Sequence, residues 1–202
     1  MEIKDLNHFK KLVKEGKIKD KWYFYKRTEK EIQFQINEIP QLIDYFNKNF
    51  GVILYPVSGT LLGIIRDGNF IAHDNDIDLA YLSLKNSKKL ILEEFHDICD
   101  KLKTDGLLTK IKINGQLHCF WKKREFKYDI WTSFIINEKY YLCPILNGEI
   151  DKSIITPFKY NSFKNINILI PNNSEKLLDS IYENWKQIDY KIGGKNKWKN
   201  IL

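Results

Sequence analysis

Three aspartates, Asp74, Asp76 and Asp78, are spaced two residues apart, and this spacing limits how the chain can fold more than any other feature. Alternate side chains of an extended strand leave the same face, so the three carboxylates would share one face with neighbours roughly 6.5–7 Å apart. Ile77 and Leu79 would then point the other way, toward a core. Carboxylates on one face repel one another and raise each other's pKa unless a cation lies between them. The spacing therefore predicts a strand with an apolar face and an acidic, cation-binding face.

The rest of the chain predicts a sheet with helices packed on it, in an α/β or α+β arrangement. We expect strands at Val52–Val57, Asp76–Leu82, Leu108–Ile113, Leu117–Lys122, Phe126–Ser133, Tyr140–Cys143 and Ile166–Ile170. We expect helices at Asp5–Glu15, Ile32–Phe50, Leu61–Arg66, Ser174–Trp185 and, after a cap at Asn86 or Ser87, along Ile91, Phe95, Ile98 and Leu102. Pro40 should break or kink its helix, giving two helical pieces.

Composition narrows the function classes. The 202 residues carry a formal net charge of +7, but the lysines are spread along the chain, so we expect no dedicated nucleic-acid binding. No apolar run approaches the roughly 20 residues of a transmembrane helix, and no signal peptide is recognisable, so we expect a cytoplasmic protein. Cys99, Cys119 and Cys143 form no CxxC pair, which favours buried free thiols over a disulfide framework or a zinc site.

The turn Ser58-Gly59-Thr60 follows an apolar strand and opens a helix. Backbone N–H groups and hydroxyls at such a turn can bind a phosphate, although Gly59 alone is equally typical of a tight turn. Arg66 closes the predicted helix and can clamp donor phosphates; a structural salt bridge to Asp67 or a glutamate is an equal alternative.

Asp129 lies in the apolar, strand-like run Lys127–Trp131. An acid in such a run is costly unless it is paired or bound to a metal. The run by itself leaves two alternatives open, a metal site and an ion pair with a buried lysine or arginine. Oxygen ligands without cysteine favour a hard ion, Mg²⁺ or Mn²⁺.

These motifs together resemble the LicD/fukutin family, within the polymerase-β-like nucleotidyltransferase superfamily. The superfamily pattern is a Gly-Ser/Thr turn, an Asp-x-Asp strand and a third acid on a neighbouring strand; Gly59-Thr60, Asp76-Ile77-Asp78 and Asp129 match it in order. The segment Ile166–Trp185 is similar to the family's closing strand and helix. Ala72 and His73 stand where Pro-Trp is commoner, Asn75 where Asp is commoner, and Glu183 where Gly is usual.

The resemblance implies one nucleotidyltransferase-type domain over residues 1–202, with a helical N-terminal segment at 1–50, a catalytic core at 51–190 and a mixed sheet flanked by helices. It implies transfer of phosphocholine, glycerol phosphate or ribitol phosphate from a CDP-linked donor to a cell-surface glycan or a lipid-linked glycan. Asp76 and Asp78 would hold Mg²⁺ or Mn²⁺, and Asp129 would complete a second metal site or take the acceptor's proton. Ser58, Gly59, Thr60 and Arg66 would bind donor phosphate.

Several residues keep open alternatives. Asp74 is expected to tune the site or to bind a metal-bound water. His73 can act as an acid, a ligand or a hydrogen-bond donor, but filling the space of the usual Trp is the favoured interpretation. Trp121, Trp131 and Trp185 can stack on a cytosine or cage a quaternary ammonium, with core packing as the default.

Two other functions compete with this hypothesis. The first is transfer of a nucleoside monophosphate from an NTP to a small acceptor. The second is a non-catalytic, basic binding module that retains the fold, which the presence of Asp76, Asp78 and Asp129 together argues against. The basic surface and the tail after Gly193-Gly194 leave a peripheral contact at the inner membrane face open.

Overall fold

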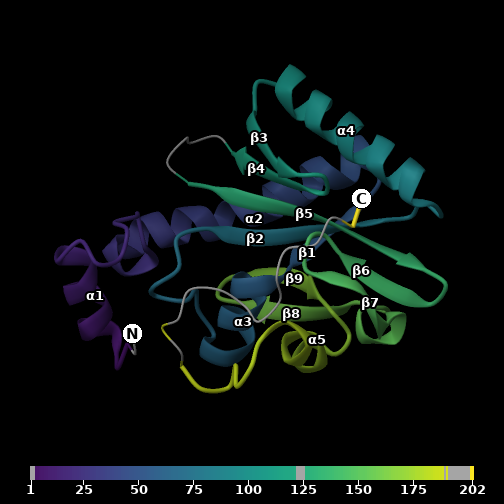
Figure 1. The fold of residues 1–202 in the computed structure, drawn as a ribbon. Coiled ribbons are helices and arrows are strands. Elements are labelled where there is room, and N and C mark those ends of the chain that lie inside the picture. Colours follow the sequence, from purple (N-terminus) through teal and green to yellow (C-terminus); the bar gives the residue numbers. More distant parts are fainter. Residues whose placement is uncertain (1–2, 122–125, 189, 191–200) are drawn as a thin grey trace.

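The protein begins with helices and continues as a mixed sheet with helices around it (Figure 1). The structure, a computed structural model, describes residues 3–121, 126–188, 190 and 201–202. Its helices are α1 (Leu6–Lys14), the 3-10 turn η1 (Phe24–Lys26), α2 (Glu29–Phe50), α3 (Ser58–Asp67), α4 (Lys88–Thr104), η2 (Lys152–Ile154) and α5 (Ser174–Ile181). Its strands are β1 (Ile53–Pro56), β2 (Ile77–Ser83), β3 (Leu108–Ile113), β4 (Gln116–Phe120), β5 (Tyr128–Ile136), β6 (Lys139–Leu142), β7 (Leu146–Asp151), β8 (Lys159–Phe163) and β9 (Ile166–Ile170).

Helix α2 runs without interruption through Pro40, so the predicted break into two pieces is wrong. Proline lacks the N–H that would bond one turn back and disfavours a helix interior by about 3 kcal/mol. Thr28 and Glu31 form a capping box at the start of α2, and Gly51 ends it in the left-handed conformation that suits glycine. Burial of one helix face offsets the loss at Pro40; this face consists of Ile36, Ile39, Leu42 and Phe46.

The main sheet confirms the mixed α/β class. Within the described residues it has the order β1-β2-β5-β4-β3, while β6 also pairs with β5, and β7 with β6. Strands β2 and β5 are parallel, and the other neighbours are antiparallel. The parallel register sets Asp78 directly beside Asp129. All seven residues of β2 are buried, as expected for a strand covered on both faces.

Helix α3 packs against β2 and α5, and the β8–β9 hairpin lies against β1 (Figure 1). Helix α4 starts after the predicted cap Ser87 and buries its predicted inner face, which confirms that helix. The three cysteines are free and buried, as predicted. Strand β4 ends at Phe120, before the predicted end at Lys122, which itself lies outside the described residues.

The last third of the chain differs most from the prediction. Strands β7 and β8 were not predicted, and α5 ends at Ile181 instead of reaching Trp185. Each missed strand exposes at least half of its residues and carries few apolar side chains, so a single-chain hydrophobic pattern is weak there. No helix in the described part of the chain is long and apolar enough to cross a membrane.

Candidate active site

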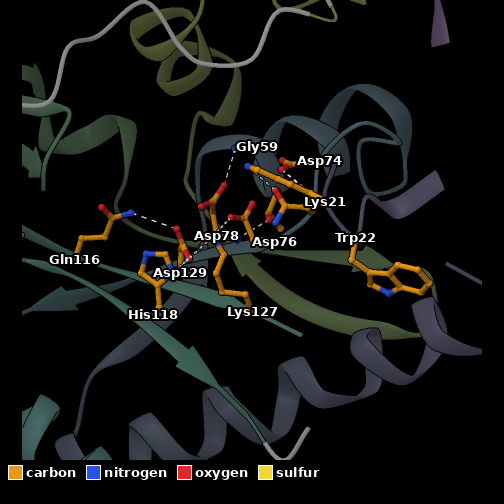
Figure 2. Close-up of polar contacts among 12 residues, drawn as sticks. Lys21, Trp22, Gly59, Asp74, Asp76, Asp78, Gln116, His118, Lys127 and Asp129 are labelled. Carbon is orange, nitrogen blue, oxygen red and sulfur yellow. Dashed lines mark hydrogen bonds and ion pairs between the residues drawn. The ribbon is translucent and has the colours of Figure 1, made fainter. Parts of the chain in front are cut away.

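Asp74, Asp76 and Asp78 converge at the start of β2 (Figure 2). Only Asp78 belongs to the strand; Asp76 immediately precedes it, and Asp74 lies further back in the connection from α3. One carboxylate oxygen of each residue lies within 4.8 Å of those of the other two. The three acids are therefore closer together than alternate positions of an extended strand would place them.

The first turn of α3 packs directly on this acidic group. The backbone N–H of Gly59 donates to Oδ2 of Asp78 at 3.2 Å, and the backbone N–H of Asp78 donates to Oγ1 of Thr60 at 2.8 Å. A Cβ on residue 59 would lie 2.5 Å from Oδ2 of Asp74, so only glycine lets the turn approach this closely. The predicted Gly-Thr turn thus fixes the position of Asp78.

Ser58 begins α3 with a φ of +48°, a conformation that is uncommon for a residue other than glycine. Its hydroxyl lies 2.9 Å from the hydroxyl of Tyr182, which follows α5. The contact between the two hydroxyls joins the turn beside the acids to the C-terminal part of the chain, at a residue whose backbone is strained. Phosphate binding by Ser58 and its two neighbours stays a prediction.

Asp129 lies on β5, next to Asp78 across the parallel pair, and opposite His118 on β4. Nε2 of Gln116 donates to Oδ2 of Asp129 at 3.4 Å, and Nδ1 of His118 lies 3.3 Å from Oδ1. Figure 2 shows Gln116 and His118 on one side of Asp129 and the other acids on the opposite side. The structure thus brings Asp129 to the group that the sequence predicted, with two partners that were not predicted.

Lys127 lies two residues before Asp129, at the entrance to β5. Its ammonium group forms an ion pair with Oδ2 of Asp76 and lies 3.2 Å from Oδ1 of Asp129. Asp129 therefore has the lysine partner that one of the two sequence-based alternatives required. The same lysine also joins the acid of β5 to the acids that precede β2.

The electrostatics follow from burial and crowding. Burial, and then repulsion from Asp76, raise the pKa of Asp74 and of Asp78 well above the usual range. The same two causes raise the pKa of Asp129 to about 6. Burial also opposes ionisation of Asp76, but the ammonium of Lys127 outweighs it and lowers the pKa. Burial, and then Lys127, lower the pKa of His118 to about 4, so this imidazole is neutral at pH 7.

The N-terminal strap, which we define as residues 19–28, lies along the segment that carries the acids. The N–H of Phe24 donates to the carbonyl of Asp74 at 2.8 Å. Arg27 is buried and donates to the backbone carbonyls of Asn75 and Trp22 at 2.6 and 2.8 Å and to Oε1 of Gln35 at 2.5 Å. The strap therefore holds the backbone between Asp74 and Asp76 in place.

Two further strap residues lie at the surface beside the site. Nζ of Lys21 donates to the side-chain oxygen of Asn75 at 3.2 Å, and the side chain of Trp22 is 48% exposed (Figure 2). Arg27 is paired instead with the backbone, and burial lowers its pKa to about 10. None of these three residues was predicted, since an isolated cation or ring on an N-terminal segment carries no spacing signal.

Arg66 and His73 contact residues other than the four acids. Arg66 forms an ion pair with Asp67 and donates to the carbonyls of Trp185 and Gln187, both at 3.3 Å. These contacts favour the structural alternative for Arg66, and its role in donor binding stays a prediction. The ring of His73 lies 5.5 Å from that of Phe9 and 4.8 Å from that of Tyr190, in an aromatic cluster. Trp121, Trp131 and Trp185 are all buried, in line with core packing.

His118 and Gln116 were missed for a different reason. The sequence offered no ligand spacing for His118, and its relation to Asp129 depends on the register of β4 against β5. Alternation along β4 gave a detectable signal, since residues 116 and 118 leave one face of a strand that follows an Asn-Gly turn. Pairing that strand with the run around Asp129 would have placed both side chains beside the acid.

A mixed sheet whose parallel pair carries acids on adjacent strands, with a Gly-Thr turn packed on one of them, defines a nucleotidyltransferase-type domain. The family model described as LicD/FKTN/FKRP, nucleotidyltransferase domain, matches residues 51–173, more than half of the chain. The chain therefore belongs to the LicD/FKTN/FKRP family, which confirms the resemblance. No curated protein sequence matches the chain. Membership of this family indicates a phosphotransferase-like, glycan-modifying activity.

Proposed function

We propose that the protein transfers a phosphorylated alcohol from a CDP-linked donor to a hydroxyl of a cell-surface glycan or a lipid-linked glycan. The alcohol would be choline, glycerol or ribitol. The observation that carries this proposal is the convergence of Asp74, Asp76 and Asp78 within 4.8 Å, beside Asp129 on the next strand. All four acids lie within residues 51–173, the part of the chain that matches the family.

The acidic group fits a hard divalent cation. Its donor set is all oxygen, and burial, followed by repulsion from Asp76, raises the pKa of Asp74 and Asp78, as expected for acids whose charge nothing local fully balances. Asp76 and Asp78 would hold Mg²⁺ or Mn²⁺, with Asp74 as a third ligand or as the partner of a coordinated water. The chemistry that such an ion supplies is neutralisation of negative charge on the donor diphosphate during transfer.

The chain's own residues would position the reactants. The acceptor hydroxyl forms a new O–P bond, the P–O–P bond of the donor breaks, and CMP leaves. The hydroxyl proton passes to Asp129, whose Oδ2 accepts a hydrogen bond from Gln116, whose Oδ1 lies 3.3 Å from Nδ1 of His118, and which faces the other acids (Figure 2). Positioning and charge balance dominate catalysis of phosphoryl transfer, which suits a site built from fixed carboxylates and a buried turn.

A panel of CDP-choline, CDP-glycerol and CDP-ribitol, each with Mg²⁺ and a set of oligosaccharides, tests the proposal. We expect CMP release that depends on the acceptor and stops when a chelator is added. A parallel panel of NTPs should release no pyrophosphate. Pyrophosphate release from an NTP without CMP release from any CDP-alcohol would contradict the proposal and support nucleotidyl transfer to a small acceptor.

A further inference from the structure

We infer that the ammonium group of Lys127 occupies the second-cation position of this site, so that the protein binds one divalent ion per chain instead of two. The inference rests on the proposed function, because it concerns the same acidic site. The Lys127 ammonium lies between Asp76 and Asp129, which belong to different segments of the sheet. A second ion shared by these two acids would have to take the same place.

The backbone holds Lys127 at this position. The N–H of Ile77 donates to the carbonyl of Lys127 at 3.2 Å, which continues the pairing of β2 with β5 by one residue. Residues two apart on an extended segment share a face, so Lys127 and Asp129 both point toward the acids that precede β2. The side chain of Lys127 is only 23% exposed, so its charge is largely withdrawn from water.

Protein groups lie close to both oxygens of Asp129, although Oδ1 accepts no hydrogen bond among the described residues. Its Oδ1 lies 3.2 Å from Nζ of Lys127 and 3.3 Å from Nδ1 of His118, and its Oδ2 accepts from Gln116. An ion at Oδ1 of Asp129 would therefore have to displace the ammonium group of Lys127. Asp129 also lies outside the group of acids, found among the described residues, whose oxygens are close enough to share one ion.

The two halves of the site therefore differ in how their charge is balanced. Asp74 and Asp78 have no ion pair with a cation within the described residues, whereas Asp76 and Asp129 share Lys127. A single divalent ion on Asp74, Asp76 and Asp78 would balance the charge that the lysine does not reach. The lysine balances charge shared by Asp76 and Asp129. A fixed ammonium has the further consequence that one positive charge is present in the site before any ion or donor binds.

Titration of the 202-residue protein with Mn²⁺ tests the inference. Calorimetry and the electron paramagnetic resonance signal of free Mn²⁺ measure how many ions bind per chain. We expect one ion per chain in the wild type and in Lys127→Arg, which keeps the charge. Lys127→Met should bind two, because the freed carboxylates of Asp76 and Asp129 then attract a second ion. The matched control is Lys152→Met, which removes a surface lysine paired with Glu138 and should still bind one.

A second variant keeps the test decisive if Lys127→Met folds poorly. Asp129→Asn should still bind one ion, with an affinity within about threefold of the wild type, because Asp129 pairs with the lysine instead of the ion. Two ions in the wild type, one ion in a folded Lys127→Met, or loss of the ion in Asp129→Asn would each overturn the inference. Absence of any bound ion would overturn the metal-dependent function itself. One bound ion without CMP release would refute only the proposal that the donor is a CDP-linked alcohol.

Discussion

The sheet and the N-terminal strap contribute to the same site in opposite ways. The acids of the sheet region lie within the family match at residues 51–173, and they are crowded, buried and mutually repulsive. The strap, residues 19–28, lies before that match and contributes backbone hydrogen bonds and one buried cation, Arg27. The acids raise the free energy of the folded protein, and the strap fixes the segment that carries them. We infer that chemistry and local stability are divided between two regions.

The largest expected effect comes from Asp78→Asn, which removes a charge from the sheet side. The amide oxygen can still accept from the N–H of Gly59, so the fold should persist. We expect turnover to fall by at least about a hundredfold, a loss typical of removing a group that stabilises transition-state charge. Donor-dependent CMP release measures this loss, and Asp97→Asn on the exposed face of α4 is the matched control. A folded variant with near-normal turnover would contradict the assignment of Asp78.

The same variant should be more heat-stable than the metal-free wild type. The raised pKa of Asp78 means that the native state binds a proton more tightly than the unfolded state. Wild-type stability therefore falls as pH rises from the unfolded pKa, about 3.9, through the raised native value. Asn does not titrate, so its advantage in melting temperature should be greatest at high pH and shrink as pH falls. Mg²⁺ should raise the melting temperature of the wild type alone; a pH-independent difference would argue against this account.

Sequence patterns predicted the acids because their information is local. Asp74, Asp76 and Asp78 lie within five residues, and the Gly-Thr turn lies shortly before them. The sequence also gave Asp129 both a metal and a lysine as alternatives, and the structure adds the lysine, Lys127. The strap contacts could not be predicted, because Arg27 and Asn75 are 48 positions apart in the chain and only the fold brings them together. The uninterrupted α2 was missed for a similar reason, since burial of its apolar face is a tertiary effect that outweighs Pro40.

The next largest effect concerns stability alone and comes from Arg27→Leu in the strap. Arg27 is 7% exposed and donates to Gln35, Trp22 and Asn75, so its loss leaves buried acceptors unpaired. We expect the free energy of unfolding to fall by about 1–3 kcal/mol for each buried acceptor left unpaired, with about 2–4 °C of melting temperature for each kcal/mol. Arg27→Lys should not rescue it, because one ammonium cannot reproduce the planar fork.

Chemical denaturation measures this change, with Lys30→Leu in the exposed first turn of α2 as the control, expected within about 0.5 kcal/mol of the wild type. Mn²⁺ binding should weaken in Arg27→Leu even where the protein is still folded, because the backbone at Asn75 is no longer held between the acids. Equal stability of Arg27→Leu and wild type would show that the strap does not support the site.

The smallest effect is expected from Lys21→Met, which tests whether two cations of the strap, Lys21 and Arg27, have different roles. Lys21 is exposed and, among the described residues, donates a hydrogen bond to the side chain of Asn75, so its removal should change stability by less than about 1 kcal/mol. Its charge nevertheless lies beside the acids, where a donor diphosphate would arrive. We expect the donor KM to rise less than about tenfold at low salt and the difference to fade at high salt, because salt screens exposed charges. Lys19→Met, an exposed neighbour, should leave KM unchanged. A loss of stability in Lys21→Met as large as that in Arg27→Leu would show that the strap acts as one structural unit, with no cation reserved for substrate.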